Sequence, residues 1–277
     1  SNDFASALAL IAAEMGRREA LWVPNAILDR YGALRDSLAS EAVITVHDQR
    51  IAFFHESFLD YVVARVLAGN DQSLTEWLLA LPEQSLFRRS QVRQVLEYRR
   101  ATDENLYLRD LEQLLSNEGV RFHIKQLVIQ WLSQQPARPQ EWRVIERCVA
   151  AADPQTEHHL ISVVRNNVVW FDLLHELGVW RAWLGGGEKE RDRAITLLAM
   201  PEVTTNRHDE VAKLLLPLAD DPEWHGRLTW LVCRVSILRG EMQRLFLRLL
   251  QDGQLDDARP GIAMNDDFWS LLYADAT

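Results

Sequence analysis

The sequence predicts an all-α protein with one small β-wing, and three observations lead to this fold class. Helical periodicity runs through nearly the whole chain, and glycine and proline are scarce, with 12 and 9 among 277 residues. The only strand-like segment is 42–54, where two apolar runs flank the polar residues His47, Asp48 and Gln49. Beyond residue 70, helix follows helix, and Pro, Gly, Asp or Asn separates them.

The first region, residues 1–69, is expected to be a winged-helix domain. Val43–Val46 and Ile51–Phe54 should form two short strands around a polar turn. A two-stranded hairpin is only marginally stable alone, so it must pack on helices. Four helical segments lie around it: Phe4–Met15, Pro24–Tyr31, Ala33–Ser40 and Glu56–Ala68. Three helices, a β-wing and a last helix describe the winged-helix order.

The second region, residues 70–277, is expected to be a HEAT-like α-solenoid. Helices of about 10–15 residues with short loops fit stacked pairs, because a single pair cannot bury its apolar face alone. The pair spacing of roughly 30–40 residues is within the HEAT range, without a crisp repeat consensus. The expected helices are Ser73–Ala80, Ser85–Arg99, Asp103–Asn117, Arg121–Ser133, Pro139–Ala151, Thr156–Arg165, Trp170–Leu177, Trp180–Leu184, Lys189–Met200, Asp209–Ala219, Glu223–Ser236, Glu241–Gln251 and Asp266–Ala274.

The segment Phe53–Leu67 resembles the end of the winged-helix domain in NACHT-type STAND ATPases. Their pattern is approximately F-x-H-x-S-F-x-E-Y-x-x-A-x-x-L, and Asp60 stands here where Glu is commoner. The upstream hairpin and the downstream helices fit the same order of parts. The matching residues are Phe53, His55, Ser57, Phe58, Tyr61, Ala64 and Leu67.

The resemblance implies that this chain is the regulatory and sensing part of a signalling ATPase. In relatives, the histidine that matches His55 contacts the phosphate of ADP held by an upstream ATPase domain and stabilises the resting state. We therefore expect an upstream domain of the same polypeptide to bind ATP or ADP, and the helical repeats to bind a protein or other macromolecular trigger. Relatives act in signal transduction, and many bacterial ones in antiviral defence. The alternative is a purely structural role, in which the His55 ring only donates a hydrogen bond to a nearby backbone carbonyl.

The chain itself is not expected to be an enzyme or to hold a cofactor or metal. It contains no G-x-x-x-x-G-K-[ST] motif, and Gly185–Gly187 has no preceding strand and no hydroxyl after Lys189. Cys148 and Cys233 lack a metal-binding spacing and are expected to be buried packing residues. The adjacent His158 and His159 diverge by about 100° on a helix, so they are poorly placed to share a metal ion. Paired aspartates, such as Asp220-Asp221, Asp256-Asp257 and Asp266-Asp267, are expected to cap helices.

Charge and aromatic residues supply the candidate partner-binding positions. The net charge is −10, and the first seventy residues hold nine acids against six arginines, which argues against DNA binding by the winged helix. Arg88, Arg89, Arg93, Arg99 and Arg100 form a local basic cluster, of which the first three are the candidate partner contacts, and Trp180 and Trp183 flank a glycine-rich loop. The alternatives are a solvated helix face paired with the acidic first region for the arginines, and inter-helix packing for the tryptophans. The acidic tail from Asp252 onward is expected to be a polar end-cap or a junction.

Two other functions remain open at the sequence level: a HEAT-like DNA-repair glycosylase, which would need a basic groove, and a plain protein–protein interaction scaffold.

No apolar run reaches about 18 residues, so no membrane span is expected. The expected compartment is the cytoplasm, and the chain is expected to be part of a longer polypeptide. The sequence names neither the trigger, the effector domain, the oligomeric state nor the number of repeats.

Overall fold

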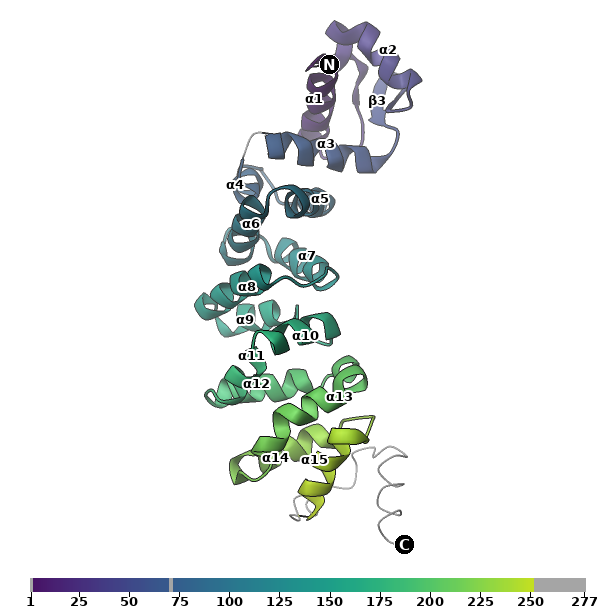
Figure 1. Ribbon diagram of the computed structural model, residues 1–277. Coiled ribbons are helices and arrows are strands. Elements are labelled where there is room, and N and C mark those ends of the chain that lie inside the picture. Colours follow the sequence, from purple (N-terminus) through teal and green to yellow (C-terminus); the bar gives the residue numbers. More distant parts are fainter. Residues whose placement is uncertain (1, 70–71, 252–277) are drawn as a thin grey trace. The chain divides into compact units, whose positions relative to one another are not determined.

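Helices make up most of the chain, and one small antiparallel sheet lies near its N-terminus (Figure 1). The computed structural model describes residues 2–69 and 72–251. The expected helix Asp266–Ala274, the aspartate pairs beyond residue 252 and the acidic tail lie outside the described residues. The described residues form two compact units. The first unit contains residues 2–132 and 143–160, and the second unit contains residues 133–142 and 161–251.

The N-terminal part of the first unit has the expected winged-helix order. Its sheet has the strand order β1-β3-β2, with both neighbouring pairs antiparallel. Strand β1 is not predicted from the sequence, because its two residues show no alternation. The elements are α1 Asn2–Arg18, β1 Val23–Pro24, the 3-10 helix η1 Asn25–Tyr31, α2 Gly32–Ser40, β2 Ile44–His47, β3 Arg50–Phe53 and α3 Glu56–Gly69.

The wing is a tight hairpin whose turn is formed by two polar residues. His47 pairs with Arg50, so only Asp48 and Gln49 lie in the turn, and their φ angles are 47° and 62°. Two successive positive φ angles give the strand crossover of a type I′ turn, which matches the twist of the flanking strands. The register places Ile44 opposite Phe53, and both side chains are buried.

The core of this winged-helix module lies between α1, the sheet and α3. Period-3.6 apolar positions of α1 and α3 face the buried side of the sheet, which excludes water from a continuous apolar cluster. The buried members are Ala7, Ile11, Ala12, Met15, Val23, Leu28, Leu38, Ile44, Ile51, Phe53, Leu59 and Val62.

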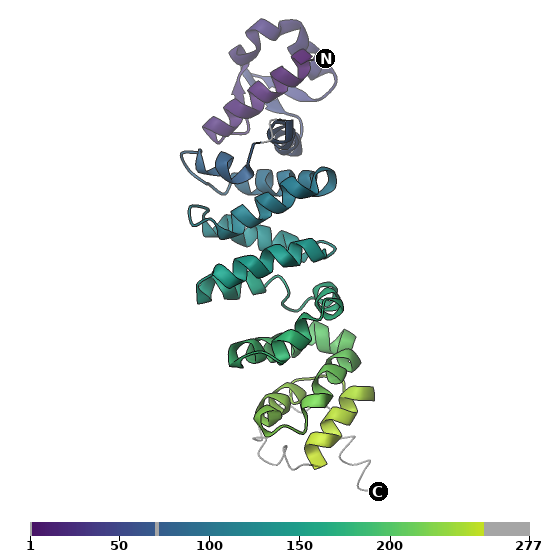
Figure 2. The ribbon, with the colours of Figure 1, turned by 60° about the vertical axis from the view of Figure 1, so that its left-hand side comes forward.

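Helical repeats make up the rest of both units (Figures 1 and 2). Polar residues cap several helices: Asp103 accepts from the Leu106 N–H at 2.9 Å, and Asn167 accepts from the Val169 N–H at 3.1 Å. Of the predicted capping aspartates, Asp221 accepts from the Glu223 N–H at 3.0 Å. The helices are α4 Leu74–Leu79, α5 Arg88–Thr102, α6 Glu104–Ser116, α7 Phe122–Ser133, α8 Pro139–Ala151, α9 Pro154–Ile161, α10 Val168–Glu176, α11 Val179–Leu184, α12 Glu188–Leu198, α13 Pro201–Leu215, η2 Leu216–Leu218, η3 Pro222–Trp224, α14 His225–Val232 and α15 Gly240–Gln251.

Side-chain contacts between neighbouring repeats recur at a nearly constant sequence distance. In the first unit, Asp110 accepts from the Leu74 N–H across 36 residues, and Arg147 binds Glu112 across 35. In the second unit, Asn166 accepts from the Glu202 N–H across 36 residues. The residue types differ, but the separation of 35–36 residues recurs within each unit and indicates a repeat of about 35 residues, as expected for HEAT-like pairs.

Two expectations about element bounds need correction. The segment Pro24–Tyr31 is not an α-helix, because Pro24 belongs to β1 and a 3-10 helix follows. Helix α13 begins at Pro201, earlier than the expected Asp209, and contains a kink at Arg207, which has φ −136°. The Arg207 guanidinium donates two hydrogen bonds of 2.7 Å to Asp172 of α10. The expected boundary after residue 69 lies inside the first unit and stays a prediction.

Candidate functional site

The motif histidine lies on the surface of the first unit, at the joint between the wing and helix α3. His55 is exposed and directly precedes Glu56, the first residue of α3. Its backbone carbonyl accepts a hydrogen bond from the Phe58 N–H at 3.0 Å. Its ring meets the exposed Phe54 ring edge-on, with 4.8 Å between the centroids. Within residues 2–69 and 72–251 the His55 ring makes no hydrogen bond, so its nitrogens face solvent.

The rest of the motif explains why this joint is rigid. Phe53 and Val62 are buried in the module core and fix β3 and α3 onto it, and Leu67 is buried farther along α3. Tyr61 lies outside this core: it is 42% exposed, and its hydroxyl accepts from Arg65 at 3.2 Å. A buried helix face behind an exposed histidine fixes the backbone at that position and leaves the ring uncovered.

Arg88 is not available to a partner, which corrects the expectation from its basic cluster. Its side chain is buried and donates to the Gly16 carbonyl at 2.5 Å and to Gln91 at 3.1 Å. The guanidinium also lies 5.7 Å from the Trp77 ring centroid. Arg88 therefore fastens the end of α1 to the start of α5. Sequence proximity put it with the surface arginines, but on a helix it points about 100° away from Arg89.

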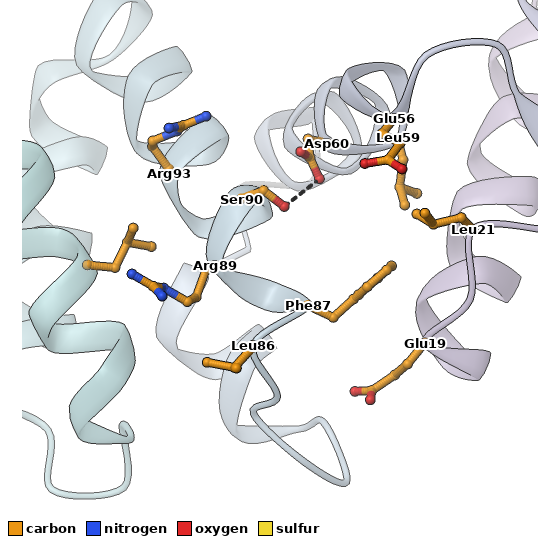
Figure 3. Close-up of a pocket in the computed structure, with 11 residues that line it drawn as sticks. Glu19, Leu21, Glu56, Leu59, Asp60, Leu86, Phe87, Arg89, Ser90 and Arg93 are labelled. Carbon is orange, nitrogen blue, oxygen red and sulfur yellow. Dashed lines mark hydrogen bonds between the residues drawn. The ribbon is translucent and has the colours of Figure 1, made fainter.

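Arg89 and Arg93 line a pocket of about 650 Å³ in the first unit (Figure 3). The two arginines lie four residues apart on α5 and so occupy one face of that helix. Glu56 and Asp60 are likewise four residues apart, at the start of α3, and they line the other side of the pocket with Glu19. Apolar side chains complete the lining: Leu21, Leu59, Leu86, Phe87 and Leu127.

The pocket separates basic from acidic groups. The Asp60 carboxylate accepts a hydrogen bond from Ser90 at 3.1 Å, and Glu19 accepts one from Ser85 at 2.8 Å. Burial raises the pKa of Asp60, although the Ser90 hydroxyl and the Arg93 charge oppose this rise. Among the described residues, Arg93 forms its ion pair with the exposed Glu97, at 3.7 Å. Arg89 has no ion pair or hydrogen bond to the described residues, and its Nε is buried.

The tryptophans near the glycine-rich loop belong to packing, which corrects the expectation for Trp180. Trp180 is 1% exposed, and its indole N–H donates to the Phe171 carbonyl at 3.0 Å. Trp183 is half-buried, with its ring centroid 5.5 Å from that of Trp180 and 5.8 Å from that of Trp142. The loop Gly185–Gly187 connects α11 to α12, as predicted. Both tryptophans point into an aromatic cluster because the short helix α11 brings them together.

The described residues contain no group of three or more His, Cys, Asp or Glu side chains that could hold a metal ion. Burial raises the pKa of the Cys148 thiol to about 11, and it also raises the pKa of Cys233. Both thiols are therefore protonated at neutral pH and poorly suited to nucleophilic chemistry. Over the same part of the chain, no helix combines the length and apolar character needed to cross a membrane.

The sequence predicts the two pocket arginines and offers the acidic first region as their alternative counterpart, but it does not predict which acids face them. A usable signal existed, because Glu56 and Asp60 repeat the four-residue spacing of Arg89 and Arg93. The buried pair of Arg99 and Asp110 was also missed: the sequence gives no sign that these two charges lie 1% and 0% exposed. A scan of protein-family models, a search of curated proteins and a search of solved structures each found no match to this chain.

Proposed function

We propose that this chain is the regulatory and ligand-sensing part of a NACHT-type STAND signalling ATPase. In this proposal an upstream domain of the same polypeptide binds ATP or ADP in the cytoplasm. The winged-helix module contacts the phosphate of the bound nucleotide, and the helical repeats bind a macromolecular trigger. The resulting signal serves defence against viruses, as it does in many proteins of that family. The proposal rests on the resemblance of the segment Phe53–Leu67 to that family. It gives the chain a regulatory role without catalysis.

The observation that supports the proposal most is the exposure of His55. A residue that reads a phosphate in another domain needs a ring that is accessible and held at a fixed position. The buried side of α3 supplies the fixed position, and the unpaired ring nitrogens supply the hydrogen-bond capacity. A purely structural role for His55 would need a hydrogen bond from its ring to a nearby carbonyl, and none occurs among the described residues.

The test uses the longer polypeptide that carries this chain, and it begins with the gene. A strand followed by G-x-x-x-x-G-K-[ST] must be encoded upstream of residue 1, and a polypeptide without that motif would refute the proposal. The remaining candidates would then be a protein–protein interaction scaffold and a DNA-repair glycosylase. Salt-sensitive binding to duplex DNA would favour the glycosylase.

His55→Ala is the sharper test in that polypeptide. Losing one hydrogen bond to a charged phosphate should weaken ADP binding about tenfold and raise basal signalling. His47→Ala is the matched control, because His47 is an exposed histidine at the tip of the same wing and pairs with Asp48. ADP retention is measured by release of labelled nucleotide from the purified protein. Equal retention in the wild type and the His55 variant would count against the sensor role.

A further inference from the structure

The pocket in Figure 3 has an arrangement of charges that the role of His55 does not explain. Its basic side comes from α5 and its acidic side from α3 and the end of α1, with Phe87 lying between the two sides. Two serine hydroxyls donate to its acids: Ser90 to Asp60 at 3.1 Å and Ser85 to Glu19 at 2.8 Å. Neither pocket arginine forms an ion pair with Glu56 or Asp60 among the described residues, so charges of opposite sign face each other without direct pairing.

The charges on the two sides of the pocket suggest what it accommodates. Arg89 makes no ion pair or hydrogen bond with the described residues, so its charge has no partner, and charge-assisted hydrogen bonds to a carboxylate would supply one. Asp60 accepts one hydrogen bond, from Ser90, and burial raises its pKa, so a basic partner would stabilise its charged form. A ligand that brings an acid to Arg89 and a base to Asp60 and Glu56 would supply both partners.

Apolar side chains define the middle of the ligand. Leu86 is 68% exposed and Leu21 is 42% exposed, and both line the pocket with Phe87. Solvent-exposed leucines at a cavity rim gain free energy when an apolar group covers them. The pocket volume of about 650 Å³ lies in the range of roughly 300–1,000 Å³ that ligand sites occupy.

We propose that this pocket binds an extended polypeptide segment with an acidic residue, an apolar residue and a basic residue on one face. The acidic residue pairs with Arg89 and Arg93, the apolar one covers Leu86 and Phe87, and the basic one pairs with Glu56 and Asp60. Side chains on one face of an extended chain alternate, so the pattern is acid-x-apolar-x-base. It spans about 14 Å at 3.4 Å per residue, enough to bridge two helices packed 8–10 Å apart. The site is distinct from His55 and needs no nucleotide.

The probe is the blocked peptide Glu-Ala-Leu-Ala-Lys, labelled with fluorescein and titrated with the full chain by fluorescence polarisation. The neutral peptide Gln-Ala-Leu-Ala-Gln should bind about tenfold more weakly, because it loses the charge-assisted hydrogen bonds at both ends. Added salt should weaken the charged probe more than the neutral one. Equal binding of the two peptides would overturn the proposal.

Variants locate the site. Arg89→Gln and Asp60→Asn should each weaken the probe about tenfold, whereas Arg143→Gln, an exposed arginine on α8 outside the pocket, should leave it unchanged. Equal losses in all three variants would contradict the assignment. Because a half-buried arginine also contributes to folding, a charge swap provides the decisive comparison: Arg89→Glu should bind Lys-Ala-Leu-Ala-Lys better than the original probe. Failure of that rescue overturns direct contact.

A short fluorescein-labelled DNA duplex tests the other class of macromolecule. The carboxylates of Glu19, Glu56 and Asp60 should repel its phosphates, so the pocket is expected not to bind it. Duplex binding that is lost in Arg89→Gln would replace the peptide by nucleic acid. None of these titrations involves nucleotide, so their failure and the failure of the His55 test can be told apart.

Discussion

At the scale of single residues, the buried Arg99 organises the junction between α3 and α4 in the first unit. Arg99 pairs with the buried Asp110 and donates to the carbonyls of Leu67 at 3.1 Å and Gln72 at 2.7 Å. Asp110 in turn accepts from the Leu74 N–H at 3.1 Å. This network satisfies backbone groups where α3 ends and α4 begins. A pair of this kind is costly to break, because a lone charge would then remain in the interior.

Arg99→Met should therefore lower the free energy of unfolding by about 3–5 kcal/mol. The measurement is urea unfolding followed by circular dichroism. Arg147→Met is the matched control, because Arg147 makes two 2.8 Å hydrogen bonds to Glu112 on the exposed surface. An exposed pair is worth less than about 1 kcal/mol. Similar losses in the two variants would contradict the role given to the buried pair.

At the scale of elements, the last turn of α1 is stabilised by a local ion-pair cluster. Glu14 accepts hydrogen bonds from Arg17 at 2.7 and 2.5 Å and from Arg18 at 2.5 Å. These bonds lower the pKa of Glu14 to about 2. Arg17 and Arg18 also lie at the C-terminal end of the helix, where positive charge is favourable. The end of α1 is the segment that Arg88 fastens to α5.

The Glu14 cluster predicts a pH-dependent contribution to stability. Because the folded state lowers this pKa, the contribution is complete above the unfolded pKa near 4.5 and is lost as the pH falls toward about 2. Glu14→Gln should therefore lower the thermal midpoint at pH 7 but differ little from the wild type near pH 2. Glu146→Gln, an exposed glutamate without an ion pair among the described residues, should differ little at any pH. A constant difference for Glu14→Gln would refute the linkage.

Two glycines of the second unit differ in whether their backbone conformation and surroundings would accept a side chain. Gly240 begins α15 with φ +57°, and an added Cβ would overlap the Asp209 carboxylate. That carboxylate accepts from the Glu241 N–H at 2.7 Å, so it caps α15 from a neighbouring repeat. Gly226 lies in α14, where an added Cβ meets no atom within 4 Å.

Alanine substitutions at these glycines should have opposite signs. Gly240→Ala should destabilise the protein by about 1–3 kcal/mol, because strained backbone and a lost cap act together. Gly226→Ala should stabilise it by about 0.5 kcal/mol, because the unfolded chain loses more freedom than the helix. Differential scanning calorimetry of the two variants measures both shifts. A lower melting temperature in both would contradict the distinction.

At the scale of the whole molecule, each unit is held together by contacts between successive repeats. In the second unit, Arg207 binds Asp172 and Arg227 binds Asp192, in both cases across 35 residues. In the first unit, Arg121 donates its backbone N–H to Gln84 across 37 residues. Each repeat therefore satisfies polar groups of its neighbour, and stability is a sum of nearest-neighbour terms. The winged-helix module joins this series through α3, which packs on α5 within the first unit.

The sequence by itself determined the local features of this protein. The type and order of the helices, the wing and most caps follow from periodicity, β-branched runs and Asp, Asn or Pro at the boundaries, because each depends on residues within one turn or hairpin. Long-range pairing decided what the sequence could not: that Pro24 joins a strand, that Arg88 and Trp180 are buried, and that Arg99 meets Asp110. It also decided that the acids of α3 face the arginines of α5 across a pocket. Burial of a charge or an indole depends on which helices pack together, and the local pattern does not contain that information.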